Sequence, residues 1–89
     1  MLERNITIVN KLGLHARAAS KLVKAANQFA STLRIQMGDK VVDGKSIMSV
    51  MLLAATQGTD VVLRTEGPDE HEAMTAIVAL IEDKFGEGA

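Results

Sequence analysis

The 89-residue sequence contains no cysteine, no tryptophan and no tyrosine, and it has only one proline and two phenylalanines. Without cysteine the chain can form no disulfide, no thiolate metal ligand and no cysteine nucleophile, and a reducing compartment suits it. Because aromatic residues are rare and the formal net charge is −1, the sequence lacks the stacking platform and the basic surface of a nucleic-acid binding protein. We therefore expect no nucleic-acid partner.

Long hydrophobic runs are also missing. The longest uncharged stretch, Ser46 to Thr59, contains polar residues and is shorter than a bilayer span, and the start of the chain lacks the features of a signal peptide. We expect a cytoplasmic protein without membrane insertion. A hydrophobic content of 47% with 24% charged residues is typical of a folding chain. Its length allows a single domain, residues 1–89, with no separate catalytic domain.

Hydrophobic periodicity predicts the elements of the first half of the chain. Residues 5–10 are rich in Ile, Val and Thr, which predicts a strand, and apolar residues at helical spacing predict a helix over 16–28. Apolar and polar residues alternate over 33–37, and a turn at 38–40 leads into 41–43. This pattern predicts a hairpin.

The second half of the chain continues with a helix predicted over 47–55. Ser46 stands where an N-cap would, and Gly58 is placed to end the helix in a left-handed conformation. This helix is apolar nearly all round, although a helix on a sheet buries only one side. Either some of its side chains are exposed or meet a partner, or the last helix and the loops bury them.

A strand over 61–66 and a final helix complete the predicted order β-α-β-β-α-β-α. Asp69 and Glu72 occupy capping-box positions at the start of that helix. Its buried stripe is predicted to consist of Met74, Ile77, Val78, Ile81 and Phe85. Such an order favours an α+β domain of two layers, with helices on one face of a small mixed or antiparallel sheet.

His15 is the strongest candidate for chemistry. It directly precedes the helix predicted at 16–28, so its imidazole is expected at or beside a helix N-terminus, where backbone N–H groups attract anions. Arg17 adds a guanidinium suited to phosphate oxygens, and an imidazole nitrogen is a competent nucleophile toward a phosphoryl group. These features suggest a transient phosphohistidine. Alternatively, His15 only caps the helix or lies on its surface, and the motif His-Ala-Arg is too short to decide.

Two other motifs are better explained without chemistry. His71 lies between two glutamates in the first turn of the last helix, where a solvated face is the simplest interpretation. Neither histidine belongs to a zinc-binding pattern, so we predict no metal site. Gly44-Lys45-Ser46 is similar to the end of a Walker A loop, but Asp39 stands where that loop needs its first glycine. We interpret Ser46 as an N-cap with a basic neighbour.

Together, these residues resemble the family of histidine-containing phosphocarrier proteins, HPr, of the bacterial phosphoenolpyruvate:sugar phosphotransferase system. The similarity covers essentially the whole chain. Its most specific motifs are Gly13-Leu14-His15-Ala16-Arg17 and Gly44-Lys45-Ser46-Ile47-Met48, and Gly67-Pro68-Asp69-Glu70 agrees as well. The resemblance implies an open-faced two-layer α+β sandwich, in which three helices cover one face of a four-stranded antiparallel sheet.

The resemblance also implies residue roles. His15 would accept a phosphoryl group from phosphorylated enzyme I and pass it to a histidine of enzyme IIA, while Arg17 would hold the phosphoryl oxygens. Ser46 would be the target of a dedicated HPr kinase/phosphorylase. The partner surface would comprise Ser20, Lys24, Lys45, Ile47, Met48 and Met51. Such a protein is a monomeric phosphoryl carrier without a cofactor, rather than a stand-alone catalyst.

Alternatives stay open at this point. Ala18 stands where many members have proline, and a nitrogen-type paralogue in a regulatory phosphorelay shares the His-Ala-Arg core. A noncatalytic regulatory binding module would use the Met-rich helix and keep His15 only as a cap. On spacing alone, Ser20 and Lys24 fit a plain solvated helix face equally well.

Overall fold

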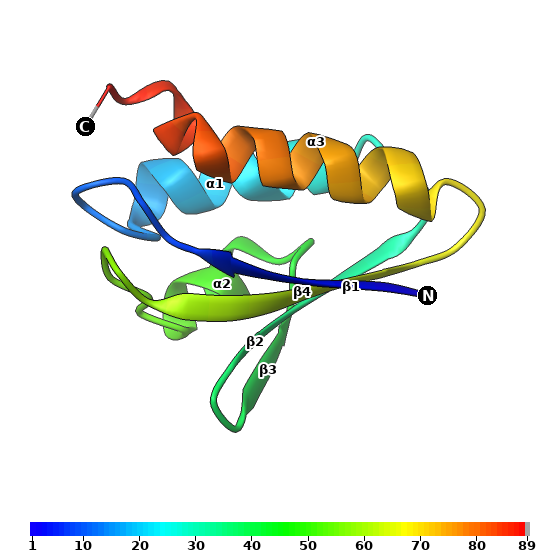
Figure 1. The fold of residues 1–89 in the computed structure, drawn as a ribbon, viewed down its shortest axis with the longest axis horizontal. Helices are drawn as coiled ribbons and strands as arrows, with labels where there is room; N and C mark the ends of the chain where they lie inside the picture. Colours follow the sequence, from blue (N-terminus) through cyan, green and yellow to red (C-terminus); the bar gives the residue numbers. More distant parts are fainter. Residues whose placement is uncertain (89) are drawn as a thin grey trace.

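The computed structural model describes residues 1–88, in which four strands form one antiparallel sheet of order β1-β4-β2-β3. The elements are β1 (Leu2–Thr7), α1 (Ala16–Ala26), β2 (Thr32–Met37), β3 (Lys40–Asp43), α2 (Ile47–Leu52), β4 (Asp60–Glu66), α3 (Glu70–Glu82) and the short 3-10 helix η1 (Lys84–Gly86). Helices α1 and α3 lie side by side over one face of the sheet, and α2 packs against α1 and β3 (Figure 1). The predicted open-faced α+β sandwich is confirmed.

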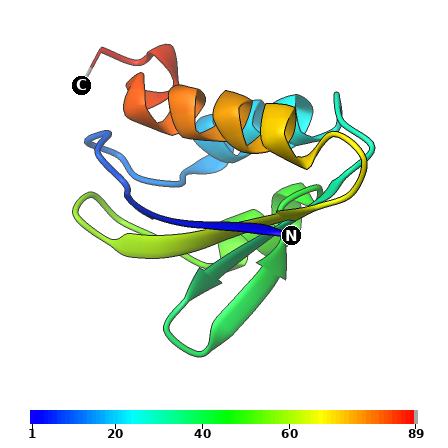
Figure 2. The same ribbon diagram turned by 45° about the vertical axis from the view of Figure 1, so that its right-hand side comes forward.

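The sheet owes its two different faces to alternation along its central strands. In β4, Val61, Leu63 and Thr65 are buried, while the residues between them are partly or fully exposed. Leu33 and Ile35 of β2 are likewise buried. The apolar side chains among these belong to one core cluster with buried residues of α1 and α3. The β2–β3 hairpin projects away from the helical layer (Figure 2). Within residues 1–88, no helix is long and apolar enough to cross a membrane.

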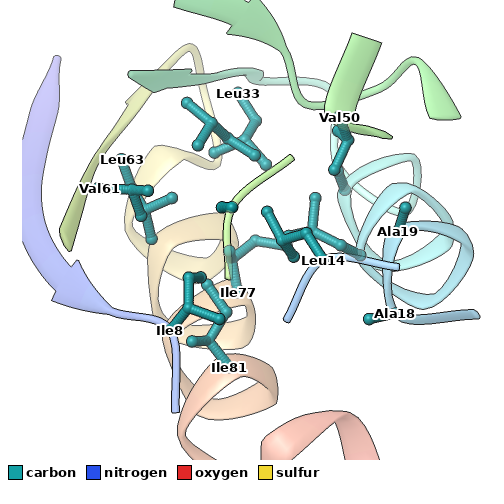
Figure 3. Packing of buried hydrophobic residues seen from close by; sticks show 14 of the residues in the cluster. Ile8, Leu14, Ala18, Ala19, Leu33, Val50, Val61, Leu63, Ile77 and Ile81 are labelled. Carbon is teal, nitrogen blue, oxygen red and sulfur yellow. The ribbon is translucent and has the colours of Figure 1, made fainter. Parts of the chain in front are cut away.

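The core lies between the sheet and the two longer helices (Figure 3). Ala18 and Ala19 of α1 are fully buried, and their small side chains let this helix approach its neighbours closely. The predicted stripe is confirmed for Met74, Ile77, Val78 and Ile81 of α3, which are buried. Phe85 is buried too, but it lies in η1, beyond the end of this helix. Burial of one large aliphatic side chain contributes about 1.5–3 kcal/mol, so the shared core holds both α1 and α3 on the sheet.

The first strand and the first helix have other bounds than predicted. The first strand was expected over 5–10, but β1 spans Leu2–Thr7, because these residues pair in register with β4. Ile8 remains hydrogen-bonded to the turn before β4 and is buried. The first helix was expected to reach residue 28 and instead ends at Ala26, with Asn27 as its C-cap.

The prediction for the end of α2 was wrong. This helix stops at Leu52 rather than at Ala55, and Ala54, not Gly58, takes the left-handed conformation after it, with φ of 52°. The early end turns the backbone so that Leu53 and Ala55 are buried. Gly58 also has a positive φ, but it lies in the turn that leads into β4.

The capping box predicted for α3 was also wrong. Asp69 is the N-cap residue, but within residues 1–88 its side chain makes no capping hydrogen bond. Its carboxylate instead accepts hydrogen bonds from the backbone N–H groups of Ala30 and Ser31 and from the Ser31 hydroxyl. Glu70, not Glu72, reaches back to accept the N–H of Gly67, at 3.2 Å. A link between two loops has replaced a local cap.

Candidate functional site

The loop between β1 and α1 delivers His15 to the N-terminus of α1. Gly13 has φ of +66°, and a side chain there would collide with the backbone carbonyl of Ala55. The next residue, Leu14, is buried and donates its N–H to that same carbonyl at 2.9 Å. The backbone just before His15 therefore adopts a conformation that requires glycine at position 13. A hydrogen bond to the segment after α2 holds it in place.

His15 is the N-cap of α1, as predicted. Its Nδ1 accepts the backbone N–H of Arg17 at 3.3 Å, and its Nε2 lies 2.5 Å from Oε2 of Glu87. An ionised carboxylate can only accept hydrogen bonds, so the proton of a neutral imidazole lies on Nε2. The lone pair of Nδ1 then points toward the first turn of α1. The His15 side chain is 29% exposed.

Cationic side chains surround a surface depression at His15. It is lined by Lys11, Leu12, His15, Ala16, Arg17, Lys21, Gly86 and Glu87. Arg17 is exposed, and within residues 1–88 its guanidinium has no hydrogen bond or ion pair. A helix N-terminus and a free guanidinium are both suited to anion binding. The arrangement can hold a phosphoryl group attached to Nδ1.

Ser46 is the N-cap of α2, as predicted. Its Oγ accepts the backbone N–H of Ser49 at 3.3 Å, and its own N–H donates to the carbonyl of Asp43 at 3.2 Å. The side chain is partly exposed. A negative group on this oxygen would lie at the positive end of a helix dipole.

Helix α2 exposes much of its apolar surface. We use the name α2 patch for the exposed side chains of Ile47, Met48, Met51 and Leu52. Met48 is 75% and Leu52 is 70% exposed, whereas Val50 on the opposite side is fully buried. Of the two explanations for the all-round apolar pattern, burial by other elements is therefore wrong. Ser20 and Lys24 are exposed on α1, which packs directly against α2.

Lys45 differs from the other residues expected on the partner surface. It is partly buried, and its Nζ donates a hydrogen bond to the backbone carbonyl of Phe29 at 2.7 Å. This carbonyl lies just beyond the end of α1, where a cation is favourable. Lys45 thus has an intramolecular partner.

His71, the other histidine, lies exposed on the first turn of α3, as predicted.

Two further residues of the site, Asn10 and Glu87, were not predicted from the sequence. Asn10 is fully buried, and its Nδ2 donates to the carbonyl of Gly13 at 2.8 Å and to Oε1 of Glu87 at 3.0 Å. The Asn10 amide, followed by the imidazole of His15, holds the pKa of Glu87 below its usual value. Glu87 lies 72 positions from His15 in sequence, so no local sequence motif predicts the contact between them.

Comparisons with known proteins agree with this geometry. A family model described as the PTS HPr component phosphorylation site matches residues 2–83. The phosphocarrier protein HPr of Cupriavidus necator is 56% identical over 88 residues, 99% of each chain. The phosphocarrier protein NPr of Shewanella violacea is 41% identical over 88 residues, covering 99% of this chain and 97% of its own.

Solved structures show the same similarity. HPr-C-His from Thermoanaerobacter tengcongensis superposes with a TM-score of 0.94 at 49% identity, covering 98% of each chain. A structure described as the HPr dimer of the same organism gives a TM-score of 0.79 at 49% identity, covering 98% of this chain and 100% of its own. On the family match, the relatives and the shared fold, the chain belongs to the HPr family of phosphocarrier proteins of the phosphotransferase system.

Proposed function

We propose that the protein accepts a phosphoryl group on His15 from phosphorylated enzyme I and donates it to a histidine of an enzyme IIA protein. One observation carries this proposal: the partly exposed imidazole of His15 caps α1 through Nδ1, next to the guanidinium of Arg17, which has no partner within residues 1–88. Nucleophile, anion-binding N–H groups and cation therefore lie within one helical turn.

The transfer uses the lone pair of Nδ1. It attacks the phosphorus atom of the phosphohistidine on enzyme I, the new N–P bond forms, and the old N–P bond breaks with its electron pair returning to the donor imidazole. The phosphoryl oxygens then accept the backbone N–H of Arg17 and its guanidinium. In the transfer to enzyme IIA, a histidine of that protein attacks the phosphorus atom. The bond to Nδ1 of His15 breaks, and its electron pair returns to the His15 imidazole. No cofactor takes part.

His15 lies in a surface depression rather than in an enclosed cavity, and this suits a carrier better than an enzyme acting alone. A carrier must present its phosphoryl group to a donor and afterwards to an acceptor, so the reacting nitrogen has to be reachable from outside. The partner active site then supplies the closed surroundings in which the barrier is lowered. His15 and Arg17 fit this requirement, because both lie at the surface.

The proposed docking surface is the α2 patch together with Ser20 and Lys24. An exposed cluster of apolar side chains on a small protein is typical of an interaction site, and flexible methionines can adapt to several partners. Enzyme I and enzyme IIA would bind there in turn, each reaching His15 at the nearby end of α1. We propose that the carrier is cytoplasmic and monomeric. A measurement of molar mass in solution tests the monomeric state directly.

We further propose that Ser46 is phosphorylated by an HPr kinase/phosphorylase. Its hydroxyl is partly exposed and already occupies the anion-favouring N-cap of α2. The α2 patch begins at the very next residue, Ile47, so a phosphate would change the charge of the docking surface directly.

Two other functions must be separated from this one. A nitrogen-type carrier would use the same His15 chemistry with different partners; the higher identity to an HPr (56%) than to an NPr (41%) favours the sugar branch. A noncatalytic binding module would use the α2 patch without phosphorylation. The exposed guanidinium of Arg17, which has no partner within residues 1–88, lines the same depression as the imidazole of His15 and favours the carrier.

Incubation with phosphoenolpyruvate and enzyme I tests the proposal. The native protein and His71→Ala should gain an acid-labile phosphate, whereas His15→Ala should gain none and keep its far-UV circular dichroism spectrum. Parallel incubation with the nitrogen-type homologue of enzyme I separates the two branches. A native protein that stays unlabelled by both, or a labelled His15→Ala, would refute the carrier function.

A further inference from the structure

The C-terminal segment after α3 folds back against the site at His15. Lys84 and Phe85 have positive φ values of 55° and 54°, and Gly86 follows with 75°. Consecutive left-handed residues are unfavourable outside glycine, so other contacts must hold this turn. Phe85 is buried and its carbonyl accepts a hydrogen bond from Nζ of Lys21 at 2.6 Å. The segment consequently lies beside the loop that carries His15 in both views (Figures 1 and 2).

A buried amide fixes the carboxylate at the end of this turn. Asn10 gives one Nδ2 hydrogen to the carbonyl of Gly13 and the other to Oε1 of Glu87. Because both partners are acceptors, the amide cannot be rotated by half a turn without losing both bonds. Its Oδ1 is buried and has no partner within residues 1–88. The orientation of the Asn10 amide that holds Glu87 in place therefore leaves Oδ1 of Asn10 without a partner within residues 1–88.

The other oxygen of this carboxylate meets the imidazole. Oε2 of Glu87 lies 2.5 Å from Nε2 of His15, and the Glu87 side chain is only 13% exposed. The contact is therefore largely shielded from water. Nδ1 lies on the other side of the ring, where it faces the N–H of Arg17.

We propose that Glu87 is a positioning residue for phosphoryl transfer, which keeps the proton on Nε2 of His15 and thereby leaves Nδ1 as the attacking nitrogen. This inference rests on the proposed phosphocarrier function. When the new bond forms at Nδ1 and the donor N–P bond breaks, the Nε2 proton stays in place. The phosphorylated ring is then cationic, and the carboxylate faces that charge. Carboxylates that orient a histidine in this way are used by hydrolase triads.

The geometry favours positioning over obstruction. A carboxylate that blocked transfer would have to lie on Nδ1 or compete for Arg17, and Glu87 does neither: its partners are Nε2 of His15 and the amide of Asn10. The incoming phosphoryl group binds at the end of α1, so Glu87 can remain in place throughout the reaction.

The test compares Glu87→Ala and Glu87→Gln with Glu82→Ala, a control that removes an equal charge from an exposed position at the end of α3. Imidazole ¹⁵N chemical shifts of the resting protein, recorded where His15 is neutral, report the tautomer directly. The rate of phosphorylation by phosphorylated enzyme I gives the effect on transfer. Amide spectra verify that each variant keeps its fold, and the Gln variant preserves the shape of the side chain.

We expect Glu87→Ala to have a smaller excess of the Nε2–H tautomer, which the Arg17 N–H on Nδ1 still favours, and to accept the phosphoryl group about ten-fold more slowly, a change equal to roughly 1.4 kcal/mol of barrier. Glu87→Gln has one acceptor oxygen for two donors, Nδ2 of Asn10 and Nε2 of His15, so it should also lose part of the tautomer excess and transfer more slowly than the native protein. Glu82→Ala should match the native protein. An unchanged tautomer in Glu87→Ala, or transfer at the native rate or faster, would overturn the proposal. If enzyme I labels no variant at all, the carrier function itself fails, while the tautomer measurement still stands.

Discussion

The backbone N–H of Arg17 donates to Nδ1 of His15 at 3.3 Å, so the cap of α1 and the proposed nucleophile are the same atom. A phosphoryl group on Nδ1 removes this acceptor. The phosphoryl oxygens can take over the N–H, and an anion at a helix N-terminus is favourable by about 0.3–1 kcal/mol. Phosphorylation therefore replaces the cap, and α1 should remain intact in both states.

Arg17 is expected to contribute to transfer and not to stability, because its guanidinium is exposed and the phosphoryl group is its only proposed partner. A hydrogen bond to a charged group contributes about 1.5–3 kcal/mol. Arg17→Ala should slow transfer from enzyme I by roughly ten- to a hundred-fold, with an unchanged melting temperature. Arg4→Ala removes an exposed arginine from β1 and serves as the control. Native transfer by Arg17→Ala, or a clearly lower melting temperature, would show that this division of roles is wrong.

Met48 is expected at the centre of the docking surface, since it is the most exposed member of the α2 patch. Met48→Asp introduces a charge that must be desolvated on binding, so the Kd for enzyme I should rise at least about ten-fold, or roughly 1.4 kcal/mol. Val41→Asp makes the same change at an exposed apolar position of β3 and should leave binding unchanged. Equal losses in both variants, or none in Met48→Asp, would place the interface elsewhere.

Phosphorylation of Ser46 should weaken docking without unfolding α2. The 11 residues of α1 span about 16 Å, and Ser46 lies near the far end of this helix, because the adjacent Lys45 bonds to Phe29. A phosphate there adds roughly 1.5–2 negative charges at pH 7, which act on the α2 patch and on the acidic partner surface that we expect Arg17 and Lys24 to recognise.

The comparison of Ser46→Asp with Ser46→Ala tests this mechanism. The Asp variant should be a poor phosphoryl acceptor, mainly through weaker association with enzyme I, and should melt at or above the native temperature. The Ala variant should transfer normally. It loses the hydrogen bond to Ser49, which costs about 1 kcal/mol, or about 4–8 °C in a domain of this size. Normal transfer by the Asp variant, or failure caused by unfolding, would exclude an electrostatic switch.

Asp69 should make the fold sensitive to acid. The Ser31 hydroxyl, followed by the N–H of Ala30, holds the pKa of Asp69 below its ordinary value of 3.8. A carboxyl with a lowered pKa in the folded state stabilises the fold above its unfolded pKa, and this stabilisation is lost as the pH falls through the folded value. Thermal melts from neutral pH to well below 3.8 should therefore show a smaller acid-induced decrease for Asp69→Asn than for the native protein.

Asp39→Asn provides the control, since it removes an equal charge from the exposed β2–β3 turn. Some acid sensitivity should persist in Asp69→Asn, because Glu70 and Glu87 also have lowered pKa values. If Asp69→Asn followed the native profile throughout, the hydrogen bonds to Ser31 would not contribute to stability.

The sequence predicted features that depend on neighbouring residues. His15 next to Ala16 and Arg17 predicted the capped helix, and Ser46 predicted the start of α2. Contacts between distant segments were beyond such patterns. Asp69 binds the loop at Ser31, and Glu87 returns to His15 after a left-handed turn that includes the buried Phe85. Tertiary contacts likewise placed the left-handed residue after α2 at Ala54, where local preference had favoured Gly58.

The most direct test is to identify the nitrogen that carries the phosphoryl group. The protein, labelled with ¹⁵N in its histidines, is phosphorylated with phosphoenolpyruvate and enzyme I, and phosphorus–nitrogen couplings are measured by NMR. The account predicts a single phosphoryl group on Nδ1 of His15, with a proton retained on Nε2 at neutral pH. A phosphoryl group on Nε2 of His15, on His71, or on no histidine would contradict it.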